Sequence, residues 1–240
     1  MYLKWNEKII TDFSDKNINS LYNEGYVFTR LGKGIMDQTR SLRINLSKFK
    51  LSSENRRVLK KIEGLNLNIE AIPYTKYDWQ IGKMAKDFYD KKFGAGVFTA
   101  NKIKELLTDK EKSNFNNLFI YNLGENNIAG YTICFADNKI VHYSYPFYIL
   151  NSKFQIPNSM GMGMMIMAIA AAKQNNMQYI YLGSAQRPTD IYKLQFAGLE
   201  WFDGEKWNDD MKELKEQIKS RGMARDPDFT AGQNKRIKYL

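Results

Sequence analysis

The chain has 240 residues, and 43% of them are hydrophobic, which is enough to bury one large core or two small ones. Its only cysteine is Cys134, so an internal disulfide and a cysteine-based zinc or iron–sulfur site are excluded within one chain. The net charge of +10 favours an anionic partner such as nucleic acid or coenzyme A, although a Lys-rich proteome explains it equally well.

Cations are concentrated in the first part of the chain. A strand-like segment at 26–30 precedes an alternating segment at 42–46, which predicts Arg43 and Asn45 on one face, and a helix follows from Ser52 or Ser53. Clustered Arg and Lys suit the phosphates of an A-form RNA stem, and the alternative is a solvated helix face. The candidate RNA-binding residues in this part are Arg40, Arg43, Arg56, Arg57, Lys60 and Lys61.

The composition changes at Ile72-Pro73-Tyr74, which is the predicted end of a small basic N-terminal α/β unit, residues 1–70. A second, larger domain over 71–208 and a basic tail over 209–240 complete the expected organisation. Helices are predicted over 77–93 and 101–107, the second one capped by Thr99. Three antiparallel strands are predicted over 118–123, 128–136 and 139–148.

A glycine turn follows these strands and opens an apolar helix that runs to about residue 176. Glycines one residue apart at a strand-to-helix junction let backbone N–H groups surround an anion, with the positive end of the helix dipole behind them. A flexible start of a helix is the simpler alternative. The residues of this turn that are predicted to bind the anionic part of a cofactor or substrate are Asn158, Ser159, Met160, Gly161, Met162 and Gly163.

The turn lacks the Lys-Ser/Thr of a kinase loop and the third glycine of a Rossmann turn, and it resembles the polar-x-x-Gly-x-Gly turn of GNAT-type N-acyltransferases. A strand at 178–182, a helix at 189–196 and a hairpin at 203–204 follow it. This order predicts an α+β, GNAT-like fold with a mixed, mostly antiparallel central sheet flanked by helices. In such a sheet the strands on either side of the turn diverge, and a carbonyl ligand fills the wedge between them.

Two blocks resemble the arginyl-tRNA–protein transferase family. The first is Ser41 to Phe49 continuing to Ser52 to Leu59, with its basic strand and paired arginines, and the second is Tyr181-Leu182-Gly183 with Tyr192-Lys193, Phe196, Leu199-Glu200 and Trp207. The resemblance implies transfer of an amino acid, arginine in that family, from charged tRNA to a protein N-terminus. It departs at Gly34 to Thr39, where the family carries cysteines, and at Ile149-Leu150, where it carries an acid and a proline. These differences imply an altered acceptor or a different acyl donor.

Aminoacyl transfer needs a protein that orients the two substrates, accepts a proton and stabilises an oxyanion; it does not need a strong protein nucleophile. The candidate catalytic residues are Tyr143, Tyr145, Tyr192 and Glu200, and Gly183 and Lys193 are candidates for contact with the acyl donor. Arg187 is a further candidate for RNA contact. His142 is interpreted as an ordinary strand histidine rather than a catalytic base, and Asp190 as a helix cap rather than an ammonium ligand.

The sequence therefore predicts an aminoacyl-tRNA-dependent transferase that acts on a protein or peptide N-terminus or another primary amine. Its partners would be the tRNA acceptor stem and the acceptor peptide, with aminoacyl-tRNA as co-substrate and no metal or resident cofactor. The alternatives are a CoA-dependent N-acetyltransferase, which would use acetyl-CoA, and a silent RNA- or protein-binding module. No signal peptide or membrane-spanning run is visible, so we expect a cytoplasmic protein with no membrane partner.

Overall fold

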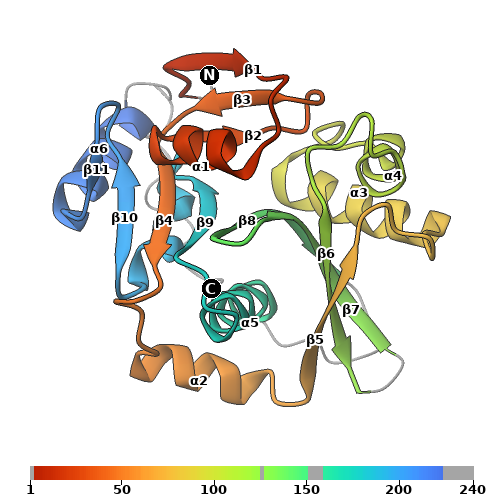
Figure 1. The fold of residues 1–240 in the computed structure, drawn as a ribbon. Helices are drawn as coiled ribbons and strands as arrows, with labels where there is room; N and C mark the ends of the chain where they lie inside the picture. The colour runs from red at the N-terminus through yellow and green to blue at the C-terminus, as the bar shows by residue number, and fades with distance from the viewer. Residues whose placement is uncertain (1–2, 125–126, 151–158, 224–240) are drawn as a thin grey trace.

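The computed structural model describes residues 3–124, 127–150 and 159–223, with side chains up to residue 219. A large sheet bends through the molecule, and helices cover both of its faces (Figure 1). In chain order the elements are β1 (Asn6–Ile9), α1 (Asp15–Asn23), β2 (Tyr26–Phe28), β3 (Ile35–Gln38), β4 (Ser41–Asn45), α2 (Ser53–Lys61), β5 (Leu65–Ala71), α3 (Trp79–Phe93), α4 (Ala100–Thr108), β6 (Asn117–Leu123), β7 (Asn127–Ala136), β8 (Ile140–Tyr148), α5 (Met160–Gln174), β9 (Tyr179–Ser184), the 3₁₀ helix η1 (Pro188–Gln195), β10 (Leu199–Phe202), β11 (Trp207–Asn208) and α6 (Met211–Met223).

The large sheet has the strand order β11-β10-β4-β9-β8-β7-β6-β5, and β1-β3-β2 form a second, smaller sheet. Every neighbouring pair of the large sheet is antiparallel except β8 and β9, which are parallel and joined through α5. The predicted mixed, mostly antiparallel central sheet flanked by helices is confirmed. Residues before and after position 71 contribute strands to this one sheet, because β4 lies between β9 and β10 and β5 forms the far edge.

Several helices begin where the sequence indicated. Ser52 caps α2 by accepting a hydrogen bond from the backbone N–H of Asn55, whose side chain bonds back to Ser52 in a capping box. Asp78 caps α3 and Thr99 caps α4 in the same way, through their side-chain oxygens. These caps fix the starts of helices that are then held by packing on the sheet.

Two apolar clusters form the core, one on each face of the sheet. The first includes Met164 and Ile166 of α5 with Val58 of α2, and the second includes Tyr22 of α1, Phe88 of α3 and Leu106 of α4. The layers therefore place α2 and α5 on one face and α1, α3 and α4 on the other (Figure 1). The parallel strands β8 and β9 run between these two layers.

Strand β8 contains a bulge that changes which side chains share a face. Tyr143 lies opposite Cys134 and Tyr145 opposite Ile133, so Ser144 is an extra residue in the ladder. Plain alternation predicts Tyr143 and Tyr145 on the same face, and this prediction is wrong because the extra residue shifts the later part of the strand by one position. Tyr143 belongs to the cluster under α5, whereas Tyr145 packs in the opposite cluster.

Candidate functional site

The parallel pair β8 and β9 is joined over only three positions. The register pairs Ile140 with Tyr179, Val141 with Ile180 and His142 with Tyr181, and it ends there. Beyond this point both strands continue without pairing to each other, β8 to Tyr148 and β9 to Ser184. The predicted divergence of these strands is confirmed, and it opens a seam whose backbone groups need other partners.

Lys193 of η1 supplies such partners on the β9 side of the seam. Its Nζ donates to the carbonyl oxygen of Leu182 at 3.0 Å and to that of Ser184 at 3.2 Å. Gly183 lies between the two carbonyls with a φ of 72°, a left-handed conformation that favours glycine and bends the end of β9. An ammonium has three protons, so these two bonds among the described residues leave one for a ligand in the seam.

Burial of the Lys193 ammonium lowers its pKa below the ordinary value, and the nearby carboxylate of Asp190 opposes this shift. Asp190 itself caps the segment before η1, because its Oδ2 accepts the backbone N–H groups of Gln186 and Arg187, each at 2.9 Å. The seam therefore contains a cation that is held by carbonyl oxygens and only remotely balanced by a carboxylate.

His142 lies at the last paired position of the seam and is 3% exposed. Its Nδ1 is 2.9 Å from the Tyr22 hydroxyl, within hydrogen-bond distance, and the same hydroxyl accepts the Phe28 backbone N–H at 3.4 Å. Burial, with a smaller effect of Lys193, lowers the pKa of His142 to about 3. A neutral imidazole with so low a pKa is a weak proton acceptor, which fits its interpretation as a strand histidine.

The N-terminus of α5 lies beside the open end of the seam. The first helical hydrogen bond runs from the Gly163 N–H to the Ser159 carbonyl at 2.8 Å, so the N–H groups of Met160, Gly161 and Met162 have no partner within the helix. A Cβ built on Gly161 would be 3.1 Å from the Tyr148 ring, at the end of β8. Three backbone donors and the positive end of the helix dipole thus lie near Tyr148, at the far end of β8.

Gly163 has a different role from the one its position in the turn predicts. Its N–H is used within the helix, and a Cβ there would be 2.4 Å from Cδ1 of Ile62, just after α2. The residue is glycine because α5 and the end of α2 pack closely at this point. Asn158, the first residue of the predicted turn, lies outside the described residues.

The three predicted catalytic tyrosines do not lie together on one side of the seam. Tyr143 is 2% exposed in the α5-side core near Thr132 and Tyr121, and burial raises the pKa of its hydroxyl. Tyr145 packs against Phe98 and Phe115 on the other face. Tyr192 is 45% exposed beside the seam, and burial around its hydroxyl raises its pKa, so it is protonated at neutral pH.

Glu200, the fourth predicted catalytic residue, lies on β10, two strands away from β9's open edge. Its Oε2 accepts the Nε–H of Arg43 at 2.8 Å, and its Oε1 is 3.8 Å from the Lys48 ammonium. This ion pair, which the sequence did not indicate, forms because β10 pairs with β4. The Glu200 carboxylate is therefore paired with Arg43 between β10 and β4, and it does not reach the seam.

The predicted RNA-binding cations divide into a buried and an exposed set. Arg40 and Arg43 are 4% and 7% exposed, so their placement on an RNA-facing surface is wrong. Both faces of β4 are covered, which alternation alone does not reveal. The exposed set consists of Arg56, Arg57, Lys60 and Lys61 on α2. Arg187 lies beside the seam, with its guanidinium 5.4 Å from the centre of the Phe93 ring.

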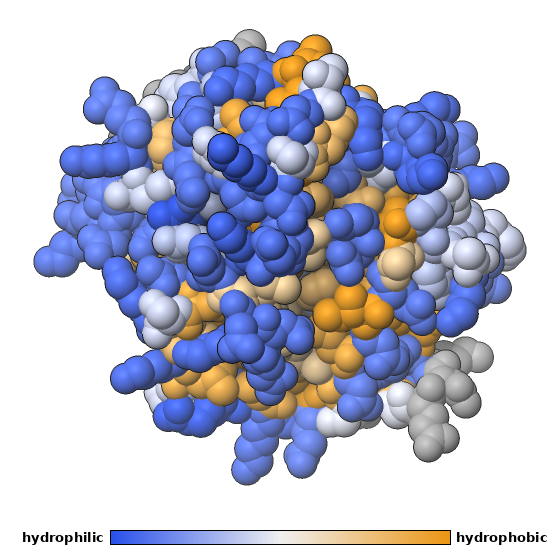
Figure 2. Space-filling view, in the orientation of Figure 1, coloured by the Kyte–Doolittle hydropathy of each residue, from blue (hydrophilic) through white to orange (hydrophobic). Residues whose placement is uncertain are grey.

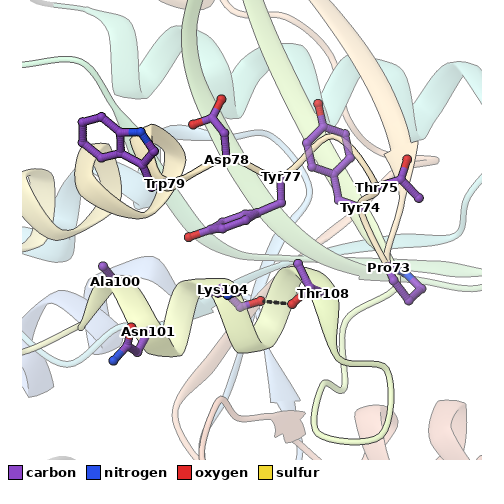
Figure 3. Close-up of a pocket in the computed structure, with 10 residues that line it drawn as sticks. All are labelled: Pro73, Tyr74, Thr75, Tyr77, Asp78, Trp79, Ala100, Asn101, Lys104 and Thr108. Atoms are coloured by element: carbon purple, nitrogen blue, oxygen red, sulfur yellow. Dashed lines mark hydrogen bonds between the residues drawn. The ribbon is translucent and has the colours of Figure 1, made fainter.

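Clefts also occur away from the seam. One of about 750 Å³ lies between the β5–α3 connection and α4, where Tyr77 points toward α4 and Trp79, 69% exposed, flanks it (Figure 3). Another of about 420 Å³ lies beside Arg43 and Glu200. Neither includes a residue of the seam, and the chemistry assembled at β8, β9 and α5 defines the candidate site instead.

Some kinds of site do not occur in the described part of the chain. Within residues 3–124, 127–150 and 159–223, no group of three or more His, Cys, Asp or Glu is arranged to hold a metal ion. The helices of these same segments include none with the length and apolarity needed to cross a bilayer.

Comparisons with known proteins find only distant structural similarities and assign no activity. No protein-family model matches the sequence, and no curated protein matches it either. Among solved structures, L-PGS from Bacillus licheniformis aligns at 14% identity and a TM-score of 0.44, over 85% of this chain and 62% of that one. The C-terminal domain of a putative lysylphosphatidylglycerol synthetase from Agrobacterium fabrum aligns at 11% identity and a TM-score of 0.44, over 86% of this chain and 70% of that one.

FemX aligns at 10% identity and a TM-score of 0.41, over 70% of this chain and 59% of that one. The chain thus spans less than two thirds of the length of two of these three structures. Similarities this distant leave the reaction to be inferred from the seam itself.

Proposed function

We propose that the chain is an acyltransferase that moves an aminoacyl group from a charged tRNA to the primary amine of a protein or peptide N-terminus. One observation carries the proposal. The parallel pairing of β8 and β9 stops at His142 and Tyr181, and the half-buried Lys193 lies just beyond that point, with its ammonium on the carbonyls of Leu182 and Ser184. An ester carbonyl placed in the seam would meet this ammonium.

The chemistry needs no protein nucleophile. A neutral amine attacks the ester carbon, the carbonyl oxygen becomes an oxyanion, and collapse of the intermediate forms the amide and releases the ribose hydroxyl, which takes up the amine's proton. The remaining Lys193 proton would stabilise the oxyanion, an effect worth about 10²–10³ in rate for one well-placed donor. An α-amino group, with an ordinary pKa near 8, is partly neutral at physiological pH without a strong base.

The anionic parts of the donor have matching partners nearby. The N–H groups of Met160, Gly161 and Met162 suit a phosphate at the start of α5. Helix α2 packs against α5 through its apolar side chains, and its cations lie on the exposed side. These cations would bind the phosphates of the tRNA acceptor stem as the stem extends away from the seam. The resemblance of residues 41–59 and 181–207 to arginyl-tRNA–protein transferases supports the same donor.

The second candidate is a CoA-dependent N-acetyltransferase, because the three backbone donors of α5 would serve a pyrophosphate equally well. One experiment separates the two. The purified chain is incubated with a peptide library and, in parallel, with a pool of radiolabelled aminoacyl-tRNAs or with radiolabelled acetyl-CoA. We expect label on peptides only from the tRNA pool. Label from acetyl-CoA alone would establish the acetyltransferase, and tRNA binding without any transfer would indicate a silent RNA-binding module.

A further inference from the structure

The cleft between the β5–α3 connection and α4 has fixed walls and the size of a ligand site (Figure 3). Its volume of about 750 Å³ lies within the range of small-molecule pockets. The backbone N–H of Tyr74 donates to the carbonyl of Leu107 at 2.7 Å and so ties the connection to the end of α4. The Tyr77 hydroxyl lies against Gly82 of α3, where an added Cβ would be 2.6 Å from it and 3.3 Å from Cβ of Ala100 on α4. The cleft is therefore part of the packing of α3 on α4.

An indole lines this cleft and stands in water. Trp79 is 69% exposed, more than any other aromatic side chain among the described residues. The face of the molecule in Figure 2 is hydrophilic over most of its area, so a large ring left in water is an exception on this surface. A planar ligand would cover the indole by stacking on it, and every nucleobase has a flat face that stacks on aromatic side chains.

The cleft also has a cation that no acid balances. Its charged lining residues are Asp78 and Lys104. Asp78 points away from α4 (Figure 3), and its Oδ1 accepts two backbone N–H groups as the cap of α3. Among the described residues no carboxylate pairs with the exposed Lys104 ammonium, whereas Lys102 on the same helix pairs with Glu105. An anionic group on the ligand would give Lys104 its partner.

Neutral polar side chains complete the lining. Thr75, Asn101 and Thr108 are exposed, and their hydroxyl and amide groups both donate and accept hydrogen bonds, as the edges of a nucleobase do. A neutral sugar would leave the Lys104 ammonium unpaired, and an apolar ligand would leave the amide and the hydroxyls without partners.

We propose that this cleft binds a nucleotide, with its base stacked on Trp79 and its phosphate at Lys104. A free mononucleotide and an unpaired nucleotide of a single-stranded RNA share this chemistry. The helices of the cleft cover the opposite face of the sheet from α2, so the site is separate from the proposed path of the acceptor stem. It does not depend on the proposed function.

The test is calorimetric titration of the full chain, at fixed salt, with nucleoside monophosphates, the matching nucleosides and a short single-stranded RNA. The monophosphates should bind roughly two- to fivefold more tightly than the nucleosides, the effect of one exposed ion pair, and Lys104→Gln should remove this difference. Trp79→Ala should weaken monophosphate binding roughly fivefold or more. RNA that binds more tightly than the monophosphates and is weakened by Trp79→Ala would identify a single-stranded RNA site; otherwise the ligand is the free nucleotide.

Two matched variants control for the loss of an aromatic ring and of a charge. Phe93→Ala removes an exposed ring at the other end of α3, and Lys102→Gln removes a cation of α4, and neither residue lines the cleft. Neither variant should change the affinity. The proposal would be overturned if wild type bound no monophosphate at millimolar concentration, or if Trp79→Ala left the affinity unchanged. Phenyl phosphate binding as tightly as the monophosphates would also overturn it, because that ligand has a ring and a phosphate but no base.

Discussion

Each edge of β9 has a cation beside it, Arg43 on one and Lys193 on the other, and the two cations have opposite surroundings. On the closed edge, β4 pairs with β9, and Arg43 is bonded to Glu200 and Asn23 and enclosed by the Tyr179 and Trp207 rings at 4.0 and 3.9 Å. On the open edge, Lys193 has two carbonyl oxygens and no carboxylate in direct contact among the described residues. Both residues belong to the motifs that the sequence singled out.

If the proposed function holds, this difference separates a structural cation, Arg43, from a functional one, Lys193. Arg43 has its charge balanced by the Glu200 carboxylate, and its planar group lies against the Tyr179 and Trp207 rings. Lys193 lies half-buried where the sheet is interrupted, and among the described residues its ammonium keeps one proton for an anionic or oxyanionic ligand. Similar side chains in one sequence pattern can therefore have unrelated roles.

The largest expected effect concerns His142, at the last position where the open edge is still paired. In the unfolded chain the His142 imidazole binds a proton near pH 6.5, whereas in the folded chain it does so only near pH 3. The free energy of unfolding should therefore fall by up to roughly 5 kcal/mol as the pH drops from 6.5 to 3. Urea unfolding of wild type and His142→Gln at pH 7, 5 and 4 measures this pH dependence of the free energy of unfolding. The variant keeps an acceptor for Tyr22, and parallel losses in both proteins would contradict a buried neutral histidine.

The next effect tests the closed edge. Arg43→Met leaves the mostly buried Glu200 carboxylate with only the more distant Lys48 ammonium, at 3.8 Å, and should lower the free energy of unfolding by about 3 kcal/mol, the lower end of the range for a broken buried pair. The double variant Arg43→Met/Glu200→Gln should recover much of this loss, and transfer per folded molecule should stay within about twofold. Arg43 would have a role beyond the ion pair if the folded variant lost transfer.

A smaller effect is expected where α5 meets α2. Gly163→Val places side-chain atoms against Ile62 and should destabilise the fold by about 1–3 kcal/mol through overpacking. Adding Ile62→Ala should reverse part of the loss, as thermal denaturation of the three proteins would show. Full stability with loss of transfer would instead mean that Gly163 contacts the donor, as its place in the turn indicates.

The smallest effect concerns the exposed cations of α2. Replacing Arg56, Lys60 and Lys61 with Gln should leave stability within about 0.5 kcal/mol. Filter binding at several salt concentrations should show the slope of log K against log salt reduced by roughly 0.7–0.9 for each phosphate that the variant no longer neutralises. An unchanged slope would remove α2 from the RNA path.

The sequence predicted the part of the fold that local patterns specify. Alternating strands joined by short turns gave β6, β7 and β8 nearly to their ends, and Ser52 and Thr99 marked helix starts because capping is a local interaction. The glycine turn correctly preceded an apolar helix and a diverging parallel strand. These features depend on residues close together in the chain.

What could not be predicted depends on long-range pairing. Nothing near residues 41–45 shows that this segment is inserted between β9 and β10, yet that insertion buries Arg43 and places Glu200 against it. The bulge at Ser144, which separates Tyr143 from Tyr145, also leaves no mark in the alternation. Lys193 was found as a donor-binding candidate, but its position on the carbonyls of β9 follows only from the folded seam.

The most direct test of the seam is the transfer rate of Lys193→Met, measured at saturating charged tRNA and peptide with wild type alongside. Removing a buried and poorly balanced charge should preserve or raise the melting temperature, whereas kcat should fall by about 10²–10³ because the oxyanion loses its donor. A folded Lys193→Met protein that transfers at the wild-type rate would contradict the seam as the place of reaction.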